Sequence, residues 1–221
     1  MPGNTRLSCA IDHLVVTAPT LDAGARYVHA ALDAKSEPGG EHARMGTHNR
    51  LLKLGESLYL EIIAINPAAP RPSRPRWFGL DRIAPDFPPR LATWVARSTD
   101  IDASLAAAGE ILGEVEPMTR GTLSWRITIP ADGVPPFDGV MPALIQWDTE
   151  EHPASRLRPT HCRLARLEAR HTHADRIRRA LHMIGCNEPL RITETFPGEL
   201  PSLTAVIETP AGRRLLGPPV S

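Results

Sequence analysis

Two segments of this chain can be written over each other without a gap, and this internal repeat constrains the fold more than any other feature. The first segment, IDHLVVTAPTLDAGARYV, begins at Ile11, and the second, LATWVARSTDIDASLAAA, begins at Leu91. Each has the pattern of a short apolar strand, a polar turn with an aspartate near the helix start, and an alanine-rich amphipathic helix. Further strand candidates follow at 46–55 and 57–65 in the first copy, and at 122–130 and 141–148 in the second. The repeat predicts a duplicated βαβββ unit and therefore an α+β fold.

The repeat divides the chain into four parts. We predict a first βαβββ module at 8–66, a proline-rich segment at 67–90, a second βαβββ module at 91–153, and a C-terminal α+β segment at 160–217. The last part is either a third, partial βαβββ-like module or an independent appendage. Seven of the 23 prolines lie between Asn66 and Arg90. Because proline lacks a backbone donor and fixes φ, this stretch predicts a linker or a covering loop, and a loop of this length often forms a lid over a site.

Composition excludes several classes of protein. The three cysteines, Cys9, Cys162 and Cys186, have no C-x-x-C spacing, so the sequence supports neither a disulfide framework nor a zinc ribbon, and we expect a reducing, cytoplasmic setting. The 25 basic side chains balance 25 acidic ones, which argues against nucleic acid as a partner. No apolar stretch approaches the roughly 18 residues of a membrane span, and the N-terminus lacks a secretory signal. We therefore expect neither a nucleic acid nor a membrane as a partner.

Two polar residues interrupt otherwise apolar strands of the first unit. His13 lies within IDHLVV and Glu61 within YLEIIA. Alternation along a strand predicts that His13 shares a face with Ile11 and Val15, and that Glu61 shares a face with Tyr59. An unpartnered polar group in such a strand costs about a few kcal/mol, so we expect a role for each. For His13 the other interpretation is a hydrogen-bonded strand histidine, and for Glu61 it is a general base or a partner for an arginine.

The quoted segments together resemble the glyoxalase-like domains of the vicinal oxygen chelate (glyoxalase/bleomycin resistance/dioxygenase) superfamily. IDHLVV, GTHNRLLKLG, YLEIIA, FGL, LATWVAR, SWRITIP and LIQWD carry the resemblance, which covers about residues 11–153. It implies paired βαβββ modules whose strands form a curled mixed sheet around a cleft that takes a small-molecule ligand or substrate. Relatives pair their modules within one chain or across a dimer, so a monomer and a homodimer both stay open. The superfamily contains isomerases, lyases, extradiol dioxygenases, thiol transferases and non-catalytic drug-binding proteins, so the fold alone does not define the reaction.

The resemblance also implies a metal site. In the superfamily a divalent metal is typically held by residues from the first and last strands of each module, which places His13 and Glu61 in the site. Thr93 and Gln146 stand at the corresponding positions of the second module, and His48 is a candidate further donor. The implied ligands are His13, His48, Glu61 and Gln146, with zinc, iron, manganese, nickel or cobalt as the metal. Glu61 is then a ligand or the catalytic residue that moves a proton.

Further residues of the predicted strands are candidate substrate contacts: Asn49, Trp94, Trp125, Arg126 and Trp147. Arg126 is suited to a carboxylate or phosphate group, with a salt bridge to Glu61 as the alternative. The three tryptophans are suited to an aromatic pocket wall, with core packing as the alternative. For His48 and Asn49 the alternative is capping of backbone groups at the start of a strand.

The sequence therefore leads to two main hypotheses for a protein of bacterial type. In the first, the protein is a metal-dependent lyase, isomerase or dioxygenase-type enzyme that acts on a small oxygen-bearing organic molecule. In the second, the same cleft holds no metal and sequesters a small molecule without converting it. A third, weaker hypothesis is an interaction protein that uses the mildly basic C-terminal segment.

Overall fold

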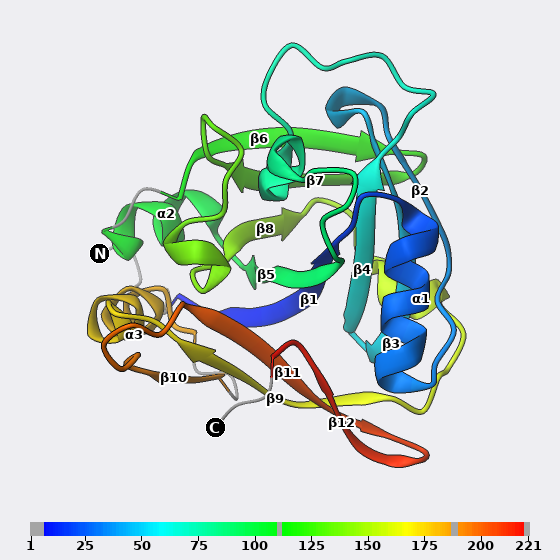
Figure 1. Cartoon of the computed structure of the whole chain (residues 1–221). Helices are drawn as coiled ribbons and strands as arrows, with labels where there is room; N and C mark the ends of the chain where they lie inside the picture. Colours follow the sequence, from blue (N-terminus) through cyan, green and yellow to red (C-terminus); the bar gives the residue numbers. More distant parts are fainter. Residues whose placement is uncertain (1–6, 110–111, 187–189, 219–221) are drawn as a thin grey trace.

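The computed structural model of the chain describes residues 7–109, 112–186 and 190–218, and its two β-sheets are stacked as layers (Figure 1). The strands of the larger sheet are β1 (Cys9–Thr17), β2 (Glu37–His42), β3 (Thr47–Gly55), β4 (Leu58–Ile65), β5 (Arg90–Ser98), β6 (Glu114–Arg120), β7 (Leu123–Ile129) and β8 (Ala143–Trp147). The smaller sheet contains β9 (Arg163–Arg170), β10 (Leu190–Thr193), β11 (Ser202–Thr209) and β12 (Gly212–Leu216). The α-helices are α1 (Leu21–Leu32), α2 (Ile101–Ala108) and α3 (Ala174–Met183). Short 3₁₀ turns are η1 (Ala43–Met45), η2 (Trp77–Arg82), η3 (Phe137–Gly139) and η4 (Pro153–Arg156).

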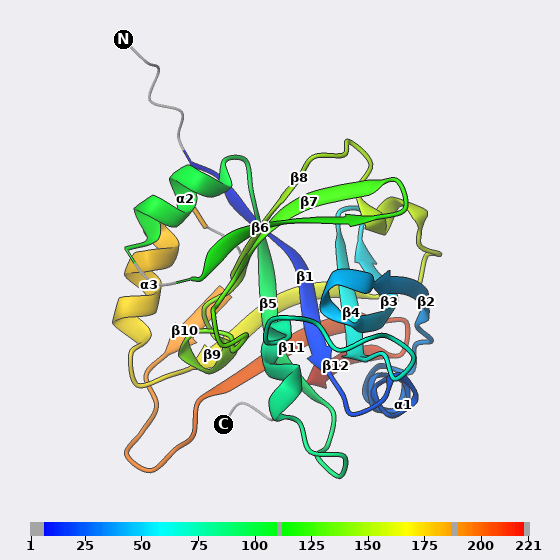
Figure 2. The ribbon, with the colours of Figure 1, turned by 90° about the horizontal axis from the view of Figure 1, so that it is seen from above.

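The larger sheet confirms the prediction of paired βαβββ modules in an α+β fold. Its strand order is β2-β3-β4-β1-β5-β8-β7-β6, so the two modules meet where β1 and β5 pair antiparallel. Within each module the first strand pairs in parallel with the last, β1 with β4 and β5 with β8. Seen from above, β1 and β5 run through the middle, with β2–β4 on one side and β6–β8 on the other (Figure 2). The strands β2 and β6 lie at the sheet edges, where a sequence such as EPGGEH is tolerated although it carries proline and glycine.

Matching helix caps show why the two copies fold alike. The side chain of Thr20 accepts a hydrogen bond from the backbone N–H of Ala23 at 3.2 Å, and Asp100 does the same for Ala103 at 3.0 Å. Each cap satisfies a backbone donor that the first turn of a helix leaves without an intrahelical partner. The repeated pattern of apolar strand, cap and amphipathic helix thus starts α1 and α2 at equivalent positions.

Each face of the larger sheet carries its own hydrophobic core. One core contains Leu14, Leu60 and Trp94 and packs beneath α1, α3 and the smaller sheet. The other contains Val15 and Ile63 with residues of β5, β7 and β8, and η2 of the proline-rich segment covers it. In Figure 1 the proline-rich segment arches over the top of the sheet. The candidate site lies on this second face, so we call it the pocket face.

A register shift in β1 decides which residues reach the pocket face. The pairing between β1 and β5 is irregular between Ile11 and His13. Ile11 packs with Leu14 in the first core, whereas His13 lines the pocket next to Val15 of the second core. The expectation that Ile11 shares a face with His13 and Val15 is therefore wrong, because a bulge inserts a residue and interrupts the alternation. The expected placement of His13 beside Val15 is confirmed.

The C-terminal segment has the element order strand, helix and three strands, but its sheet is assembled differently from the two modules. Its strand order is β10-β9-β11-β12, with β9 parallel to β10 and antiparallel to β11. Residues 187–189 of the predicted 160–217 segment lie outside the described residues. The segment contributes residues such as Leu167, Ile177 and Ala205 to the first core.

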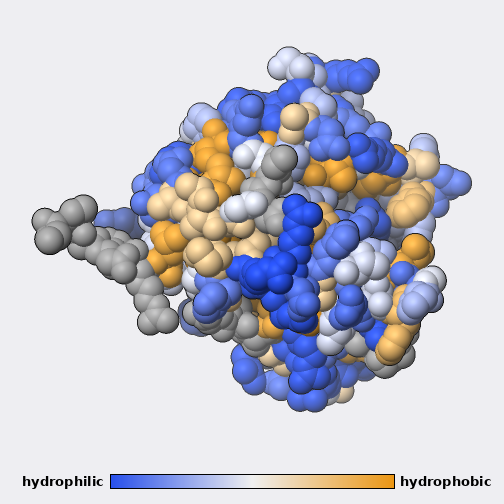
Figure 3. Space-filling model, turned by 90° about the vertical axis from the view of Figure 1, so that its left-hand side faces the viewer, coloured by the Kyte–Doolittle hydropathy of each residue, from blue (hydrophilic) through white to orange (hydrophobic). Residues whose placement is uncertain are grey.

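On the side of the molecule that carries α2 and α3, hydrophilic groups alternate with small apolar patches (Figure 3). None of the described helices is long and apolar enough to cross a membrane.

Candidate functional site

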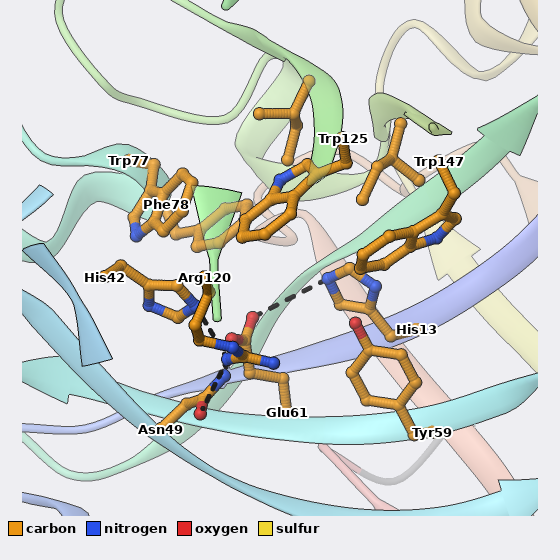
Figure 4. A pocket seen from close by; sticks show the side chains of 12 residues that line it. His13, His42, Asn49, Tyr59, Glu61, Trp77, Phe78, Arg120, Trp125 and Trp147 are labelled. Atoms are coloured by element: carbon orange, nitrogen blue, oxygen red, sulfur yellow. Dashed lines mark hydrogen bonds and ion pairs between the residues drawn. The ribbon is translucent and has the colours of Figure 1, made fainter. Parts of the chain in front are cut away.

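A pocket opens on the pocket face where the strands of both modules converge under η2, and aromatic side chains form much of its wall (Figure 4). It encloses about 350 Å³ of empty space, including its open mouth. The lining residues are His13, His42, Asn49, Tyr59, Glu61, Trp77, Phe78, Arg120, Trp125, Ile127, Ile145 and Trp147. A largely apolar wall with a few converging polar groups is typical of a small-molecule site.

The imidazole of His13 and the carboxylate of Glu61 face each other in this pocket, although they belong to different strands. Nε2 of His13 lies 3.7 Å from Oε2 of Glu61, and both residues are only about 5% exposed. Oε1 of Glu61 accepts a hydrogen bond from Nδ2 of Asn49 at 2.6 Å. The amide of Asn49 therefore fixes one carboxylate oxygen and leaves the other directed at His13.

Asp12, which sequence reasoning overlooked, holds His13 from the other side. Its Oδ1 accepts a hydrogen bond from Nδ1 of His13 at 2.7 Å, and its Oδ2 accepts from Nε1 of Trp147 at 2.9 Å. Nε2 of His152 lies 3.0 Å from the same Oδ2. Burial by itself raises the pKa of the Asp12 carboxyl, but hydrogen bonds from His13 and His152 and the electrostatic interaction with both residues outweigh it and hold this pKa well below its usual range. An ionised Asp12 keeps the proton of His13 on Nδ1 and turns Nε2 toward Glu61.

A second polar group lies next to Asn49, where the Arg120 side chain crosses from β6 to the first module. Its Nη1 donates to Nε2 of His42 at 3.2 Å and lies 3.4 Å from Oδ1 of Asn49. Since arginine stays protonated, Nε2 of His42 is the acceptor and its Nδ1–H donates to Oγ1 of Thr47 at 3.1 Å. Burial, with the positive charge of Arg120 as the next cause, lowers the pKa of His42 to about 3, so its imidazole is neutral. Among the described residues Arg120 makes no ion pair with a carboxylate.

Aromatic rings close the remaining sides of the pocket. Tyr59 stacks on the imidazole of His13 with a centroid distance of 4.6 Å, and burial raises the pKa of its phenol well above the usual range, so the group is neutral. Trp125 and Trp147 both line the pocket and contact each other with a centroid distance of 5.3 Å. Trp77 and Phe78, which η2 supplies, form the opposite wall at a centroid distance of 5.5 Å.

Three of the sequence candidates face away from the pocket. Trp94 is fully buried in the first core, where its Nε1 donates to the carbonyl of Val140 at 2.8 Å. Arg126 does not pair with Glu61, because its Nη1 donates to Asp102 at 2.7 Å. Gln146 accepts hydrogen bonds at Oε1 from the Ile101 backbone N–H at 2.8 Å and from Nη2 of Arg126 at 3.0 Å. Each follows from strand alternation, since Val95, Trp125 and Ile145 beside them belong to the second core.

Strand register also changes the counterpart of Glu61 in the second module. Glu61 pairs with Val15, and Ala143 pairs with Val95, which is the residue that overlays Val15 in the repeat. Ala143, rather than Gln146, therefore occupies in β8 the place that Glu61 has in β4. The second module offers Thr93 and Ala143 where the first offers His13 and Glu61, so its side has lost both strong metal donors.

His48 lies on β3 beside Asn49 but does not line the pocket. Its side chain is partly buried, and this burial lowers the pKa of its imidazole. Alternation explains the difference, because Asn49 is directed into the pocket and its neighbour points to the other face. His48 is therefore not among the groups that converge on His13 and Glu61.

The donors present do not fit a resident divalent ion. Catalytic zinc sites generally use three protein ligands, and in the described part of the chain no three His, Cys, Asp or Glu side chains converge in that way. Only Nε2 of His13 and Oε2 of Glu61 face a common point, and the one other imidazole nitrogen lining the pocket, Nε2 of His42, accepts a hydrogen bond from Arg120.

Residues 11–185 match the family model of the glyoxalase-like domain, and the chain belongs to this family, within the vicinal oxygen chelate superfamily. The family assignment confirms the resemblance found in the sequence. It also places the protein among superfamily members that act on or bind small molecules.

Several solved structures are similar to this chain. A hypothetical protein from Staphylococcus aureus matches 85% of this chain and 86% of its own, with 15% identity and a TM-score of 0.56, which shows a shared fold. Methylmalonyl-CoA epimerase from Streptomyces coelicolor, in complex with 2-nitronate-propionyl-CoA, matches 66% of this chain and 99% of its own, with 23% identity and a TM-score of 0.45. The epimerase from Mycobacterium tuberculosis matches 66% and 91%, with 17% identity and a TM-score of 0.40. No curated protein gives a significant match to the sequence.

Proposed function

We propose that this protein binds a small organic molecule through a carbonyl or carboxyl oxygen and transfers a proton at the adjacent carbon, as an isomerase-type enzyme. The observation that carries this proposal is the alignment of Asp12, His13 and Glu61, in which two potential proton carriers face each other at 3.7 Å. Such an arrangement in a buried, aromatic-walled pocket is suited to acid–base chemistry.

The proposed proton transfer needs no second substrate, oxidant or reductant. The free oxygen of Glu61 accepts the proton as the C–H bond breaks, and the electron pair moves onto the carbonyl oxygen to form an enolate. The N–H groups of Arg120 lie in the same pocket and stabilise that negative charge. The proton then returns to the carbon from Glu61, either directly or after passing to Nε2 of His13, and restores the carbonyl with a changed configuration or position of the C–H bond.

His13 and Asp12 have separate roles in this proposal. Asp12 has no place in the pocket lining and acts through its neighbours: its Oδ1 holds the Nδ1 proton of His13 through the 2.7 Å hydrogen bond, and its Oδ2 holds Trp147. Asp12 is therefore a positioning residue, and His13 is the second acid–base group. This division follows the general logic of a base oriented by a third group.

The loss of donors in the second module favours a second candidate, a protein that binds the same compound without converting it. Thr93 and Ala143 stand in place of the strong donors there, and neither side chain acts as an acid or a base near neutral pH. In that case Glu61 and Asn49 orient the ligand, and the rings around them supply most of the affinity.

Hydrogen–deuterium exchange separates the two candidates. The protein is incubated in D₂O with a panel of small carbonyl compounds, such as pyruvate, 2-oxobutanoate and acetoacetate, and loss of the C–H signal is followed by ¹H NMR. We expect exchange above the spontaneous rate for the compounds that bind, and its loss by at least about a hundredfold in Glu61→Gln, which keeps the shape but not the base. Compounds that bind without any catalysed exchange would support the binding protein instead.

The control variant and a metal arm complete this experiment. Glu208→Gln, at a half-exposed glutamate of β11 on the smaller sheet, is expected to leave exchange unchanged. The same assay is repeated after chelation and after addition of zinc, iron, manganese, nickel or cobalt. Exchange that appears only with one of these ions would contradict proton transfer by the side chains alone and restore the metal-assisted hypothesis.

A further inference from the structure

A second cavity adjoins the first on the pocket face and is almost entirely apolar. Its empty volume is about 310 Å³ when the open solvent at its mouth is counted, and it shares Trp77, Phe78 and Ile127 with the first pocket. Its other lining residues include Thr93, Leu112, Ile129, Pro135 and Ala143. Among the residues that the structure describes, no charged side chain borders it, so it is suited to a hydrocarbon group rather than to a polar one.

The repeat explains why this space exists. Thr93 and Ala143 both line the second cavity, and they stand at the places that His13 and Glu61 have in the first module. Thr93 and Ala143 are smaller than a histidine and a glutamate, so the second module has fewer polar groups and more empty space on the same face of the sheet. The second module has thus lost its polar groups where the second cavity lies.

Arg120 provides the opposite chemistry at the first pocket. Its stem passes over Gly40, where an added Cβ would lie 2.9 Å from Cδ of Arg120, so the glycine gives the side chain room to reach the pocket. Only its Nη1 makes hydrogen bonds with described residues, to His42 and Asn49. Its remaining N–H groups are available to a carboxylate, and a planar guanidinium fits that group through two parallel hydrogen bonds.

The aromatic pair between the two cavities is held in a strained loop. Phe78 has φ 58°, which is rare for a residue with a bulky side chain. The backbone N–H of Gly79 donates to the carbonyl of Gly133 at 2.8 Å, and the guanidinium of Arg76 donates to Asp81 at 2.6 Å, and both contacts fix the loop. Strain of this kind persists where surrounding contacts enforce it, and it is concentrated at ligand sites.

From these observations we infer that the ligand is a carboxylate with an apolar tail, its head bound by Arg120 and its tail in the second cavity beyond Trp77 and Phe78. This inference deepens the proposed function, because it rests on the same pocket and names the class of compound that enters it. The head group lies beside Asn49 and Glu61, and the tail follows the apolar surface toward Ala143. The carboxylate supplies a counter-charge for the Arg120 guanidinium, which no described carboxylate provides.

Equilibrium binding of three probes tests the inference without any need for turnover. Octanoate has head and tail, octanamide has the tail with a neutral head, and propanoate has the head with a short tail. Binding is measured by calorimetry and by the fluorescence of the pocket tryptophans. We expect octanoate to bind at least about tenfold more tightly than either other probe, since each lacks one of the two interactions.

Two variants separate the head and tail sites. Arg120→Gln is expected to weaken octanoate binding at least about tenfold and to leave octanamide unchanged. Ala143→Leu fills the second cavity and is expected to weaken octanoate while propanoate binding stays as in the parent protein. Arg126→Gln serves as the matched control, because Arg126 lies on the neighbouring strand and pairs with Asp102 outside the pocket. Thermal unfolding of each variant verifies that it is folded.

The outcomes distinguish this inference from the proposed function. Equal affinity for octanoate and octanamide, an equal effect of Arg126→Gln and Arg120→Gln, or an unchanged affinity for octanoate in Ala143→Leu overturns the inferred ligand class. The expected binding pattern without catalysed deuterium exchange supports the ligand class and contradicts only proton transfer. Catalysed exchange without the expected pattern leaves proton transfer standing and overturns the ligand class.

Discussion

Nδ1 of His13 and Oδ1 of Asp12 lie 2.7 Å apart, although the two residues are neighbours in one strand. In a regular strand adjacent side chains point to opposite faces and do not meet. The register shift between Ile11 and His13 brings the carboxylate and the imidazole together, and Asp12 remains fully buried. This one irregularity orients the imidazole on which the proposed proton transfer depends.

Asp12→Asn is expected to lower the free energy of unfolding by about 1–3 kcal/mol. The amide has one oxygen where the carboxylate has two, so the donors on His13, Trp147 and His152 cannot all keep an acceptor. Urea denaturation of the variant measures this change. Asp102→Asn, at an exposed aspartate paired with Arg126, is the control and is expected to change stability by less than about 1 kcal/mol. Equal losses of stability in the two variants would show that the native protein does not depend on a carboxylate at Asp12 to accept these hydrogen bonds.

Because His42 is buried, we expect the folded protein to lose stability as the pH falls. Its pKa is lowered to about 3 by burial, from an ordinary value of 6.5, so between these values the unfolded chain binds a proton that the native protein does not. The free energy of unfolding therefore decreases as the pH falls from about 6.5 toward 3, by about 1.4 kcal/mol per unit at most from this group.

Urea denaturation at pH 7, 6, 5 and 4 measures this slope. His42→Gln is expected to reduce the slope of the free energy of unfolding against pH by the amount that corresponds to about one bound proton. His29→Gln, at an exposed position of α1, is the control for loss of an imidazole and is expected to keep the slope of the parent protein. The same slope in His42→Gln and in the parent protein would contradict a neutral, buried His42.

Gly24 marks the closest approach of α1 to the sheet. A Cβ at this position would lie 2.4 Å from Cγ2 of Ile62 and 3.0 Å from Cβ of Ala18. Gly24→Ala is therefore expected to lower the free energy of unfolding by about 1–3 kcal/mol, although alanine favours helix more than glycine does. Ala30→Gly, at an exposed position of the same helix, measures the change in helix propensity, at about 1 kcal/mol. A stabilising effect of Gly24→Ala would show that the helix is not packed this tightly.

The tryptophans are expected to respond differently to substitution. Trp94→Phe removes the hydrogen bond to Val140 in the first core and is expected to cost about 1–3 kcal/mol of stability. It is expected to leave the fluorescence change on octanoate binding in place, because its ring lies on the far side of the sheet. Trp125→Phe is expected to diminish that fluorescence change, since this ring lines the pocket. Loss of the signal in Trp94→Phe instead would contradict the assignment of faces.

Much of the fold follows from local features of the sequence. The repeated strand, cap and helix pattern predicts the two modules because Thr20 and Asp100 begin equivalent helices after equivalent strands. The edge strands β2 and β6 are not located by this reasoning, because their contacts rather than their composition make them strands. The signal for Asp12 is present in the sequence, as a charge in an apolar strand next to His13, and the argument made for Glu61 applies to it equally.

The sequence by itself predicts the paired modules, because the internal repeat is written in the chain, and its resemblance to the glyoxalase-like domains is what placed His13 and Glu61 in a common cleft. Only the tertiary structure decides the rest of the site. The bulge in β1, the crossing of Arg120 from the second module and the cover formed by Trp77 and Phe78 depend on strand register and long-range contacts. Those contacts are set by how the two sheet faces pack, and a shift of one residue reverses which side chains reach the pocket.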